Sequence, residues 1–412
     1  MDASDPSPLP VVGMVGAGQL ARMTHQAAIG LGQSLRVLAA DPGDPAALVC
    51  ADVRLGAATD LSALHAFARG CAAVTVDHEQ VPQENLRALL AAGVAVHPRP
   101  DALLHAQDKL VMRRRLAALG ATVPPFAQVC EPADIERFAA DHGWPVVLKA
   151  VRGGYDGRGV WLLDPSAGAE RGAPVAELLA AGVPLMVEQA VPMRRELAAL
   201  VARSPYGQAA AWPVVETVQA RGQCVQVLAP APGLDPEVGA GAQRLALHIA
   251  AELDVTGLLA VELFETLDGG LVVNELAMRP HNCGHWTIEG ARTSQFEQHL
   301  RAVLDYPLGA TTPTAPAVVM ANVLGAVSPA PISVDERVHQ LFARFPDVKV
   351  HLYGKAERPA RKVGHVTVLG ADMDAARGRA TLAANWLSAG VWTDGWSPHD
   401  RGAGGAGCLT RW

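Results

Sequence analysis

This sequence has few cysteines and no long apolar run, so it lacks the usual marks of exported proteins, of membrane proteins and of proteins with a structural metal site. Its six cysteines are widely scattered without a Cys-x-x-Cys pair, which argues against a disulfide framework or a structural zinc site and favours a reducing cytoplasm. No run reaches the roughly 18 apolar residues of a membrane span. The opening residues MDASDPSPLP also lack the charged and apolar segments of a signal peptide. We therefore expect a soluble protein that is not exported.

Basic charge is also scarce. The formal net charge is −7, and Lys and Arg form no sustained block. We therefore expect no binding to nucleic acid or to a membrane surface, because both partners are polyanions. A local basic pocket for one small anionic metabolite remains compatible with this balance.

The apolar pattern predicts three regions with α/β and α+β character. Up to about residue 105, runs such as VVGMVG, LRVLAAD, AAVTVD and VAVHP alternate with helical stretches, as in a doubly wound parallel sheet. The middle region opens with a helix in QDKLVMRRRLAALG and continues with strand pairs such as PVVLKAV and GVWLLD. After the linker GATTPTAPA, short strands and a helix at about 372–389 form a small β-rich region, and we expect a disordered tail at 401–412.

The first glycine turn, VGAGQLARM, resembles a dinucleotide-binding fingerprint. Gly16, Gly18 and Ala21 match G-x-G-x-x-G/A after a strand, and Asp41 closes the next strand. Such a turn places backbone N–H groups at a helix N-terminus, where any phosphate is stabilised. We therefore predict a phosphate site, with NAD binding or a purely structural turn as the alternatives.

A second glycine-rich segment, GGYDGRG, follows a strand that ends at Lys149. Glycines let backbone amides approach a ligand without interference from Cβ atoms. The segment leads into a strand and contains no G-K-[ST], so it is not a Walker A loop. We predict a lid of N–H groups over nucleotide phosphates, with a plain glycine-rich hairpin as the alternative.

The third motif is an acidic hairpin in LLAVELFETLDGGLVVNELAMRP. If Asp268 and Gly269 form a two-residue turn, Glu262 lies directly opposite Glu275. Like charges at this spacing repel each other, so a positive group should lie between them. A divalent cation is the ordinary solution, and Asn274 offers another oxygen ligand. A shared proton or two solvated acids are the alternatives.

In their order along the chain, QDK, VVLK, GGYDGRG, EQ with Glu196, and AVELF…VNELAMRPHNCGH resemble the ATP-grasp superfamily. Within it they resemble the PurK-type family of 5-(carboxyamino)imidazole ribonucleotide synthetases. The resemblance implies an ATP-grasp fold with a Rossmann-like domain (1–105), an ATP-grasp domain (106–310) with a lid at about 122–192, and a C-terminal domain (311–400).

The resemblance also implies an activity. ATP phosphorylates bicarbonate to carboxyphosphate, and the exocyclic amine of 5-aminoimidazole ribonucleotide is then carboxylated, with release of ADP and phosphate. The protein would be a carbon–nitrogen ligase of de novo purine biosynthesis that uses ATP and Mg²⁺ and forms a homodimer.

Site residues follow from the same resemblance, motif by motif. Those implied to bind ATP are Lys109, Lys149, Gly154, Tyr155, Asp156, Gly157, Arg158, Gly159, Val160, Glu188, Gln189, Ala190, Val191, Glu196, Gln219, Asn274 and Glu275. Those implied to hold magnesium are Glu262 and Glu275, and those implied to act in catalysis are Tyr155, Asp156, Arg158, Arg279 and His281. Those implied to bind the ribonucleotide are Gln19, Leu20, Glu79, Lys355, Arg361 and Lys362.

Three other functions stay open at this point. One is a formate-dependent glycinamide ribonucleotide transformylase of the same superfamily. Another is an NAD-dependent oxidoreductase built on the first domain, and the last is a nucleotide sensor without catalysis. The transformylase predicts ATP turnover triggered by formate and not by bicarbonate. The oxidoreductase predicts an absorbance change from hydride transfer, and the sensor predicts ATP binding without substrate-stimulated release of ADP.

Overall fold

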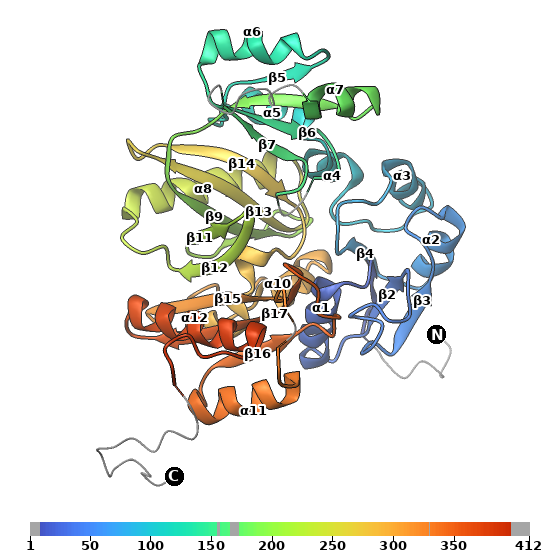
Figure 1. The fold of residues 1–412 in the computed structure, drawn as a ribbon. Coiled ribbons are helices and arrows are strands. Elements are labelled where there is room, and N and C mark those ends of the chain that lie inside the picture. Colours follow the sequence, from blue (N-terminus) through green and yellow to red (C-terminus); the bar gives the residue numbers. More distant parts are fainter. Residues whose placement is uncertain (1–8, 155–156, 165–172, 329, 397–412) are drawn as a thin grey trace.

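The computed structural model describes residues 9–154, 157–164, 173–328 and 330–396. Within these residues the strands form three sheets. In Figure 1 the N-terminal domain lies beside a large central sheet and the lid lies above that sheet. The C-terminal strands belong to the same sheet and lie at its lower end with their helices. The predicted tail at 401–412 lies outside the described residues. None of the described helices combines the length and the apolar character needed to cross a membrane.

The N-terminal domain is built on a parallel sheet, as its alternating pattern predicts. Its strands lie in the order β3-β2-β1-β4, and every neighbouring pair is parallel. The run VAVHP forms only an isolated bridge, Val74 to Val96, so its prediction as a strand is wrong. The elements are β1 (Val12–Val15), α1 (Gln19–Gly30), β2 (Leu35–Ala39), β3 (Asp52–Leu55), α2 (Leu61–Ala68), β4 (Ala73–Val76), α3 (Gln83–Ala91) and α4 (Pro100–Gln107).

The lid follows the helix predicted in QDKLVMRRRLAALG. That helix is α5 (Lys109–Ala118); Asp108 caps its N-terminus, and Gly120 follows its end with φ +77. The lid sheet has the order β5-β8-β6-β7, and all of its pairs are antiparallel. Its elements are β5 (Phe126–Val129), α6 (Ala133–His142), β6 (Val146–Ala150), β7 (Val160–Leu163), α7 (Ala173–Ala180) and β8 (Leu185–Gln189).

The central sheet is antiparallel and continues without a break into the C-terminal region. Its order is β14-β13-β9-β11-β12-β15-β17-β16, with β10 paired to β9. The junction is the pairing of β12 with β15. The apolar pattern indicates strands in both regions but not that they share one sheet. The strands are β9 (Met193–Arg203), β10 (Ala209–Ala211), β11 (Val215–Ala220), β12 (Gln223–Ala229), β13 (Gly257–Thr266), β14 (Leu271–Ala277), β15 (Ala317–Leu324), β16 (Lys349–Leu352) and β17 (Lys362–Gly370).

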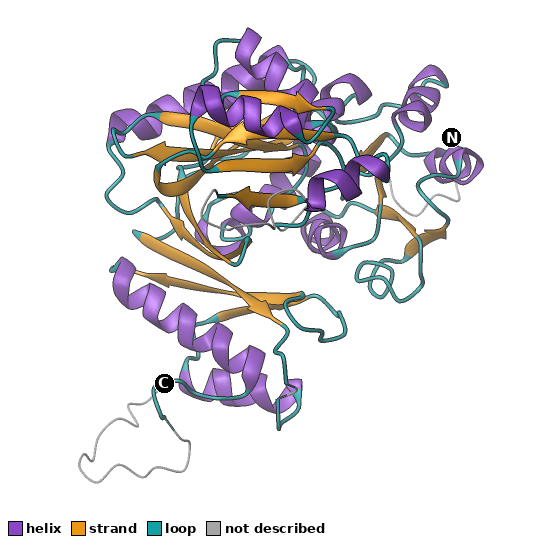
Figure 2. Cartoon of the chain, turned by 45° about the horizontal axis from the view of Figure 1, so that its top comes forward, coloured by secondary structure: helices purple, strands orange, loops and turns teal. Residues whose placement is uncertain are grey.

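Helices cover the faces of this sheet (Figure 2). Helix α12 (Met373–Ala389), predicted at 372–389, packs on β15 and β17 through a core that includes Val319, Val366 and Trp386. The remaining helices are α8 (Pro236–Glu252), the 3-10 turn η2 (Asn282–Gly284), α9 (Thr287–Gly290), α10 (Gln295–Val303) and α11 (Val334–Arg344).

Helix α10 joins the N-terminal domain to the central sheet. Its Leu300 and Val303 pack in one core with Val12 and Met14 of β1, and it also contacts β9 and β13. Because apolar surface is buried between them, the two domains are fixed relative to one another. This packing brings the segment after β4 beside the central sheet, where Glu79 pairs with Arg279.

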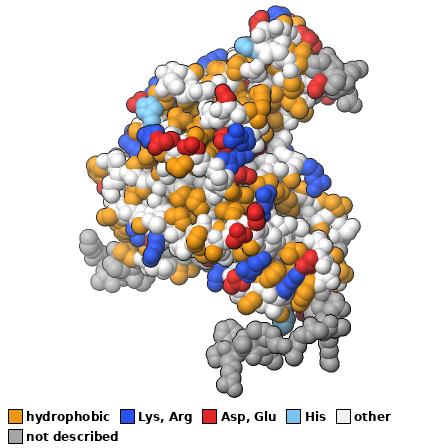
Figure 3. Space-filling view, turned by 90° about the vertical axis from the view of Figure 1, so that its left-hand side faces the viewer, with side chains coloured by type: hydrophobic (Ala, Val, Ile, Leu, Met, Phe, Trp, Pro, Cys, Tyr) orange, Lys and Arg blue, Asp and Glu red, His pale blue; other side chains and the backbone are white. Residues whose placement is uncertain are grey.

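Acidic and basic side chains lie intermixed over the face shown in Figure 3, with hydrophobic side chains between them. This distribution agrees with the absence of a long basic run in the sequence.

Candidate active site

The candidate site lies where the lid sheet meets the central sheet. Residues 190–192 connect β8 of the lid to β9 of the central sheet, so Gln189, Ala190 and Val191 lie on the link between the two sheets. The N-terminus of α5 closes one side, because the Lys109 amide donates to the carbonyl of Val151 at 3.0 Å. Charged side chains from the lid, α5 and β14 therefore meet in one place.

A buried charge cluster forms the floor of this site. The Glu188 carboxylate accepts from Arg113 Nε at 2.6 Å and forms an ion pair with Lys149 Nζ at 2.7 Å. Lys149 Nζ also donates to Asn274 Oδ1 at 3.1 Å. Burial lowers the pKa of Lys149. Burial opposes ionisation of Glu188 as well, but Lys149 and Arg113 bring the pKa of its carboxyl below the usual range.

This cluster corrects one prediction. The Glu188 side chain is only 3 % exposed, and both of its oxygens are used by Arg113 and Lys149. Its carboxylate therefore holds Lys149 and Arg113 in place, and it is too buried for the direct contact with ATP that the resemblance implies. Arg113 is a residue that the motifs missed. It lies four positions after Lys109 on the same helix, so it shares a face with a predicted site residue.

The acidic hairpin has the predicted opposition of Glu262 and Glu275. The predicted two-residue turn is wrong, because Thr266 N–H bonds the Gly270 carbonyl and the loop has three residues, 267–269. Gly269 has φ +85, as this loop type requires. A bulge between Glu262 and Leu263 shifts the register back by one residue, with Asn274 as the extra residue. Two unpredicted irregularities therefore compensate, and the two carboxylates still face each other.

The two carboxylates are electrostatically different. Burial, followed by the charges of Glu275 and Glu196, raises the pKa of Glu262 to about 8. Burial acts on Glu275 in the same direction, but the Lys109 ammonium, 2.7 Å away, brings the pKa of Glu275 below its usual range. The side chains keep 28 % and 40 % of their surface accessible, so water in the cleft moderates both shifts. Glu275 thus has its counter-ion, whereas Glu262 lacks full compensation for its charge.

This arrangement fits a magnesium ion bound with a nucleotide. In the described residues no group of three or more His, Cys, Asp or Glu side chains is arranged to hold a metal ion. A pair of carboxylates with an amide oxygen nearby is nevertheless what Mg²⁺ uses when phosphates and water complete its coordination. The raised pKa of Glu262 is consistent with a position where extra positive charge is favourable.

The imidazole ring of His281 contacts the Glu262 carboxylate. Its Nε2 lies 3.3 Å from Glu262 Oε1, and its Nδ1 accepts from the Cys283 amide at 3.4 Å. Since Nδ1 is an acceptor, the proton lies on Nε2 and points at the carboxylate. Burial lowers the pKa of His281 to about 3, so the ring is a neutral donor.

The second glycine segment approaches another glycine turn. A Cβ on Gly157 would lie 3.1 Å from the Cα and the oxygen of Gly222 in the β11–β12 turn. Both glycines have positive φ, +76 and +74. The lid loop therefore contacts the central sheet backbone to backbone, which side chains at either position would prevent. In the same segment a Cβ on Gly154 would lie 2.8 Å from the Arg158 carbonyl, and Gly159 has φ +73. The predicted Tyr155 and Asp156 lie outside the described residues.

The predicted nucleotide residues on neighbouring strands also come together. Val160 begins β7 directly opposite Lys149. Burial raises the pKa of Glu196, while a hydrogen bond from Gln219 and the charge of Lys149 oppose the rise. Glu196 and Gln219 thus form one polar patch on β9 and β11, within electrostatic reach of Lys149.

The predicted ribonucleotide residues converge from three regions of the chain. Lys355 Nζ donates to Gln19 Oε1 at 2.5 Å, and Arg279 Nε pairs with Glu79 Oε2 at 2.8 Å. The charge of Lys362 acts on Glu262 and His281, and Arg361 precedes it at the start of β17. Leu20 is 6 % exposed and its side chain packs in the core, so the predicted contact with the ribonucleotide would involve its main chain.

The amide of the first glycine turn binds the carboxyl group of Asp77, a residue of the same domain. The Gly18 amide donates to Asp77 Oδ2 at 2.6 Å, and a Cβ on Gly16 would lie 2.0 Å from Asp77 Oδ1. Burial raises the pKa of Asp77, and its carboxyl lies at the end of β4. The prediction that these glycines bind a phosphate is therefore wrong, and the NAD alternative loses its main support. The signal, Asp77 at the end of the adjacent strand, is visible in the sequence but has no distinctive spacing.

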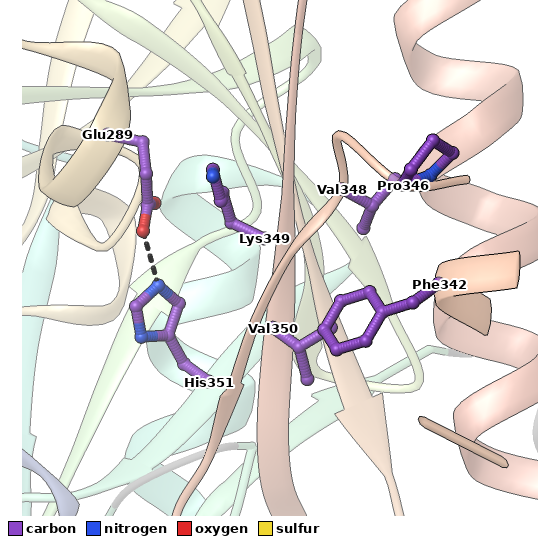
Figure 4. A pocket seen from close by; sticks show the side chains of 7 residues that line it. All are labelled: Glu289, Phe342, Pro346, Val348, Lys349, Val350 and His351. Atoms are coloured by element: carbon purple, nitrogen blue, oxygen red, sulfur yellow. Dashed lines mark hydrogen bonds and ion pairs between the residues drawn. The ribbon is translucent and has the colours of Figure 1, made fainter. Parts of the chain in front are cut away.

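A separate pocket of about 340 Å³ lies at the edge strand β16 (Figure 4). Phe342, Val348 and Val350 form its apolar side, and His351 Nε2 contacts Glu289 Oε1 at 2.7 Å on the other. None of the predicted site residues lines it.

Comparison with known proteins agrees with this geometry. Family models match as a ribonucleotide synthetase preATP-grasp domain (residues 9–107), an ATP-grasp domain (114–296) and a phosphoribosylaminoimidazole carboxylase C-terminal domain (318–379). N5-carboxyaminoimidazole ribonucleotide synthase of Mycobacterium bovis is 63 % identical over 390 residues, covering 95 % of this chain and 90 % of the relative. The chain belongs to the N5-carboxyaminoimidazole ribonucleotide synthase family. Its fold is the ATP-grasp fold with a preATP-grasp domain at the N-terminus.

More distant members support the same assignment. The Corynebacterium ammoniagenes synthase is 52 % identical over 398 residues, covering 94 % of each chain. A solved structure of the Aspergillus clavatus synthase in complex with ADP and 5-aminoimidazole ribonucleotide has a TM-score of 0.82 at 29 % identity, covering 92 % of this chain and 98 % of that one. Family membership excludes the oxidoreductase and favours the synthase over the transformylase.

Proposed function

We infer that the protein catalyses ATP-dependent carboxylation of 5-aminoimidazole ribonucleotide with bicarbonate in purine biosynthesis. The observation that supports this most directly is the 63 % identity to a named synthase over 95 % of the chain. The convergence of Lys109, Lys149, Glu262 and Glu275 in one cleft gives the assignment a physical basis. The protein is a carbon–nitrogen ligase of the ATP-grasp type.

We propose that ATP binds between the lid and the central sheet. Lys109 and Lys149 lie side by side, each held by a carboxylate, so they offer positive charge to phosphate oxygens. Amides of the glycine segment at 154 and 157–160 cover the phosphates from the lid. The link at 189–191 and the pair Glu196–Gln219 supply backbone and polar groups for the adenine and ribose.

Glu262, Glu275 and Asn274 are the residues that would hold magnesium. When bound there, the ion would neutralise charge on the transferred phosphoryl group. His281 donates from Nε2 toward Glu262 and so fixes the direction of that carboxylate.

The chemistry has two balanced steps. A bicarbonate oxygen attacks the γ-phosphorus of ATP, the bond to the β-phosphate oxygen breaks, and ADP leaves. The exocyclic amine of the ribonucleotide then attacks the carboxyl carbon of carboxyphosphate, phosphate leaves, and the amine loses one proton. We propose that Arg279, paired with Glu79, lies beside the reacting carboxyl group, and that Lys355, Arg361 and Lys362 bind the ribonucleotide phosphate.

The lid has a chemical purpose in this scheme. Carboxyphosphate is a mixed anhydride that water destroys, so the cleft should close before it forms. Close approach of Gly157 to Gly222 gives the lid a defined contact on the central sheet. We propose, from the family resemblance, that Tyr155, Asp156 and Arg158 contact bicarbonate or the nucleotide.

The proposal is tested by ADP release. With ATP and magnesium present, release should require both bicarbonate and 5-aminoimidazole ribonucleotide, and labelled bicarbonate carbon should appear in the ribonucleotide product. Formate in place of bicarbonate should give no turnover. Turnover with formate and glycinamide ribonucleotide would contradict the proposal and support the transformylase.

We further propose that the protein is a homodimer, by analogy with its family, and that it resides in a reducing cytoplasm. The five cysteines in the described residues are free thiols, as expected in that compartment. Sedimentation equilibrium of the purified protein tests the oligomeric state, and a monomer at micromolar concentration would contradict it.

A further inference from the structure

Helix α10 begins with a buried glutamine whose side chain holds the active-site turn. We propose that Gln295 is a positioning residue for carboxylation: its amide fixes the main chain of His281 and thereby directs the His281 ring at Glu262. The inference rests on the proposed function, and it adds a residue that no motif in the sequence indicates.

The side-chain amide of Gln295 makes two bonds to one residue. Oε1 accepts from the His281 amide at 2.9 Å, and Nε2 donates to the His281 carbonyl at 2.8 Å. Gln295 is fully buried, and a Cβ on Gly284 would lie 2.3 Å from its Oε1. The amide therefore has little room to move, and the main chain of His281 is fixed on both sides.

Fixing the main chain at this position fixes the ring. His281 begins the turn η2, and its Nδ1 accepts from the Cys283 amide within that turn. The ring is therefore oriented by the turn, and the turn is attached to α10 through Gln295. A change of this attachment moves Nε2 relative to Glu262 without removing any group that touches a reactant.

A column of buried aromatic rings supports the clamp from behind. Gln295 Nε2 also lies 2.9 Å from His285 Nδ1, and the His285 ring lies 5.0 Å from that of His365. His365 stacks on His351 at 4.5 Å and bonds the Tyr353 hydroxyl through Nδ1 at 2.7 Å. The column runs from the pocket in Figure 4, where His351 meets Glu289, to the active-site turn.

The same helix supplies a matched control. Gln298, one turn later on α10, is also fully buried and also clamps one main-chain residue. Its Nε2 donates to the Gly309 carbonyl at 2.9 Å, and its Oε1 accepts from the Gly309 amide at 2.7 Å. Gly309 lies in the connection between α10 and β15, away from the cleft. The two glutamines thus share helix, burial and bonding, and differ in what they hold.

The experiment compares Gln295→Met with Gln298→Met, because methionine keeps the volume and removes both polar groups. Both variants should have a lower melting temperature than the wild type. We expect Gln295→Met to lower kcat/KM for 5-aminoimidazole ribonucleotide by about 30- to 100-fold, as a displacement of about 1 Å can cost. The KM for ATP should change less than about threefold, since Lys149 and the lid are untouched. Gln298→Met should keep wild-type kinetics.

The outcomes separate the claims. If both variants lose turnover equally, or if Gln295→Met retains full turnover, Gln295 is structural only and the inference is wrong. If Gln295→Met does not fold, Gln295→Glu replaces it, because it keeps the acceptor for the His281 amide. We expect its loss to be smaller but measurable, and wild-type kinetics would overturn the inference. If the wild type itself releases no ADP with bicarbonate and the ribonucleotide, the proposed function fails instead.

Discussion

Replacing Glu262 with glutamine should stabilise the metal-free protein above neutral pH. The folded protein holds Glu262 with a pKa of about 8, because of burial and the charges of Glu275 and Glu196, against 4.5 for an unperturbed glutamate. The folded state therefore binds more protons than the unfolded state between these values. Stability contributed by this residue falls as pH rises from about 4.5 to about 8. Glutamine cannot ionise, so Glu262→Gln removes this loss.

The size of the effect follows from the two pKa values. Each unit of difference corresponds to about 1.4 kcal/mol, which gives about 3–4 kcal/mol between pH 5 and pH 8. Water reaches the side chain, which is 28 % accessible, so we expect roughly 2–3 kcal/mol. With about 2.1 cal/mol/K per residue, 412 residues give roughly 1 °C per kcal/mol. The melting temperature of Glu262→Gln minus that of the wild type should thus increase by about 2–3 °C from pH 5 to pH 8.

Glu275→Gln should act in the opposite direction. Glu275 is the counter-ion of Lys109, at 2.7 Å, and the Lys109 side chain is only 11 % accessible. Removing the carboxylate charge leaves a buried ammonium without its partner. Because Glu275 itself is 40 % accessible, we expect a cost of only about 1 kcal/mol at pH 7. Both variants should nevertheless lose at least about 100-fold in kcat, because both remove a ligand charge beside the transferred phosphoryl group.

The assay is a pair of measurements on each variant. Melting temperature is recorded without magnesium from pH 5 to pH 9, and bicarbonate-dependent ADP release is recorded with saturating magnesium. The double variant should lose much less activity than the product of the single losses, since both residues serve one ion. Equal stability changes in both single variants, or a pH-independent difference for Glu262→Gln, would refute the electrostatic reasoning. Near wild-type turnover in either variant would show that the hairpin is structural.

Three other substitutions test separate parts of the site. Glu188→Gln should lower stability by about 3 kcal/mol and raise the KM for ATP, because it leaves Arg113 and Lys149 with a weaker buried partner; thermal unfolding and ATP kinetics measure both. Gly222→Ala should lower turnover more than Gly207→Ala, because both have positive φ but only Gly222 faces the lid loop; equal turnover would contradict the lid contact. Arg361→Ala should raise the KM for the ribonucleotide about 10- to 100-fold and leave the KM for ATP unchanged; equal weakening of both substrates would argue against a phosphate contact.

The sequence predicts the fold class because its periodicities are strong. Alternating strands and helices before residue 105 indicate a parallel sheet, and β1, β2 and β4 form where the apolar runs indicate. The run VAVHP is predicted as a strand but forms only a single bridge, between Val96 and Val74, and no strand extends from that bridge. Continuity of the central sheet through β12 and β15 depends on a pairing between strands about 90 residues apart, which local pattern does not specify.

Part of the site can be predicted from the sequence, because the type of a residue limits the chemistry that its side chain can perform. Opposed carboxylates at Glu262 and Glu275 follow from hairpin geometry, although the sequence indicates neither the three-residue loop nor the bulge that produce this pairing. The sequence does not indicate the pairing of Glu188 with Arg113, because the fold brings Arg113 of helix α5 against strand β8 from about 75 positions earlier in the chain. Gln295 gives no signal at all, since a glutamine at the start of a helix is ordinary until its two bonds to His281 are seen.

The transfer of the γ-phosphoryl group of ATP to bicarbonate is the central step of the proposed reaction. Following an oxygen atom of bicarbonate into the released phosphate tests this step most directly. The wild-type protein is incubated briefly with ¹⁸O-labelled bicarbonate, ATP, magnesium and 5-aminoimidazole ribonucleotide, and the released phosphate is analysed by mass spectrometry. A bicarbonate oxygen that attacks the γ-phosphorus stays on phosphorus when the amine attacks carbon, so each phosphate should contain one ¹⁸O from bicarbonate. Phosphate without label, released at the same rate as ADP, would mean that the phosphoryl group passes to water and would contradict the account.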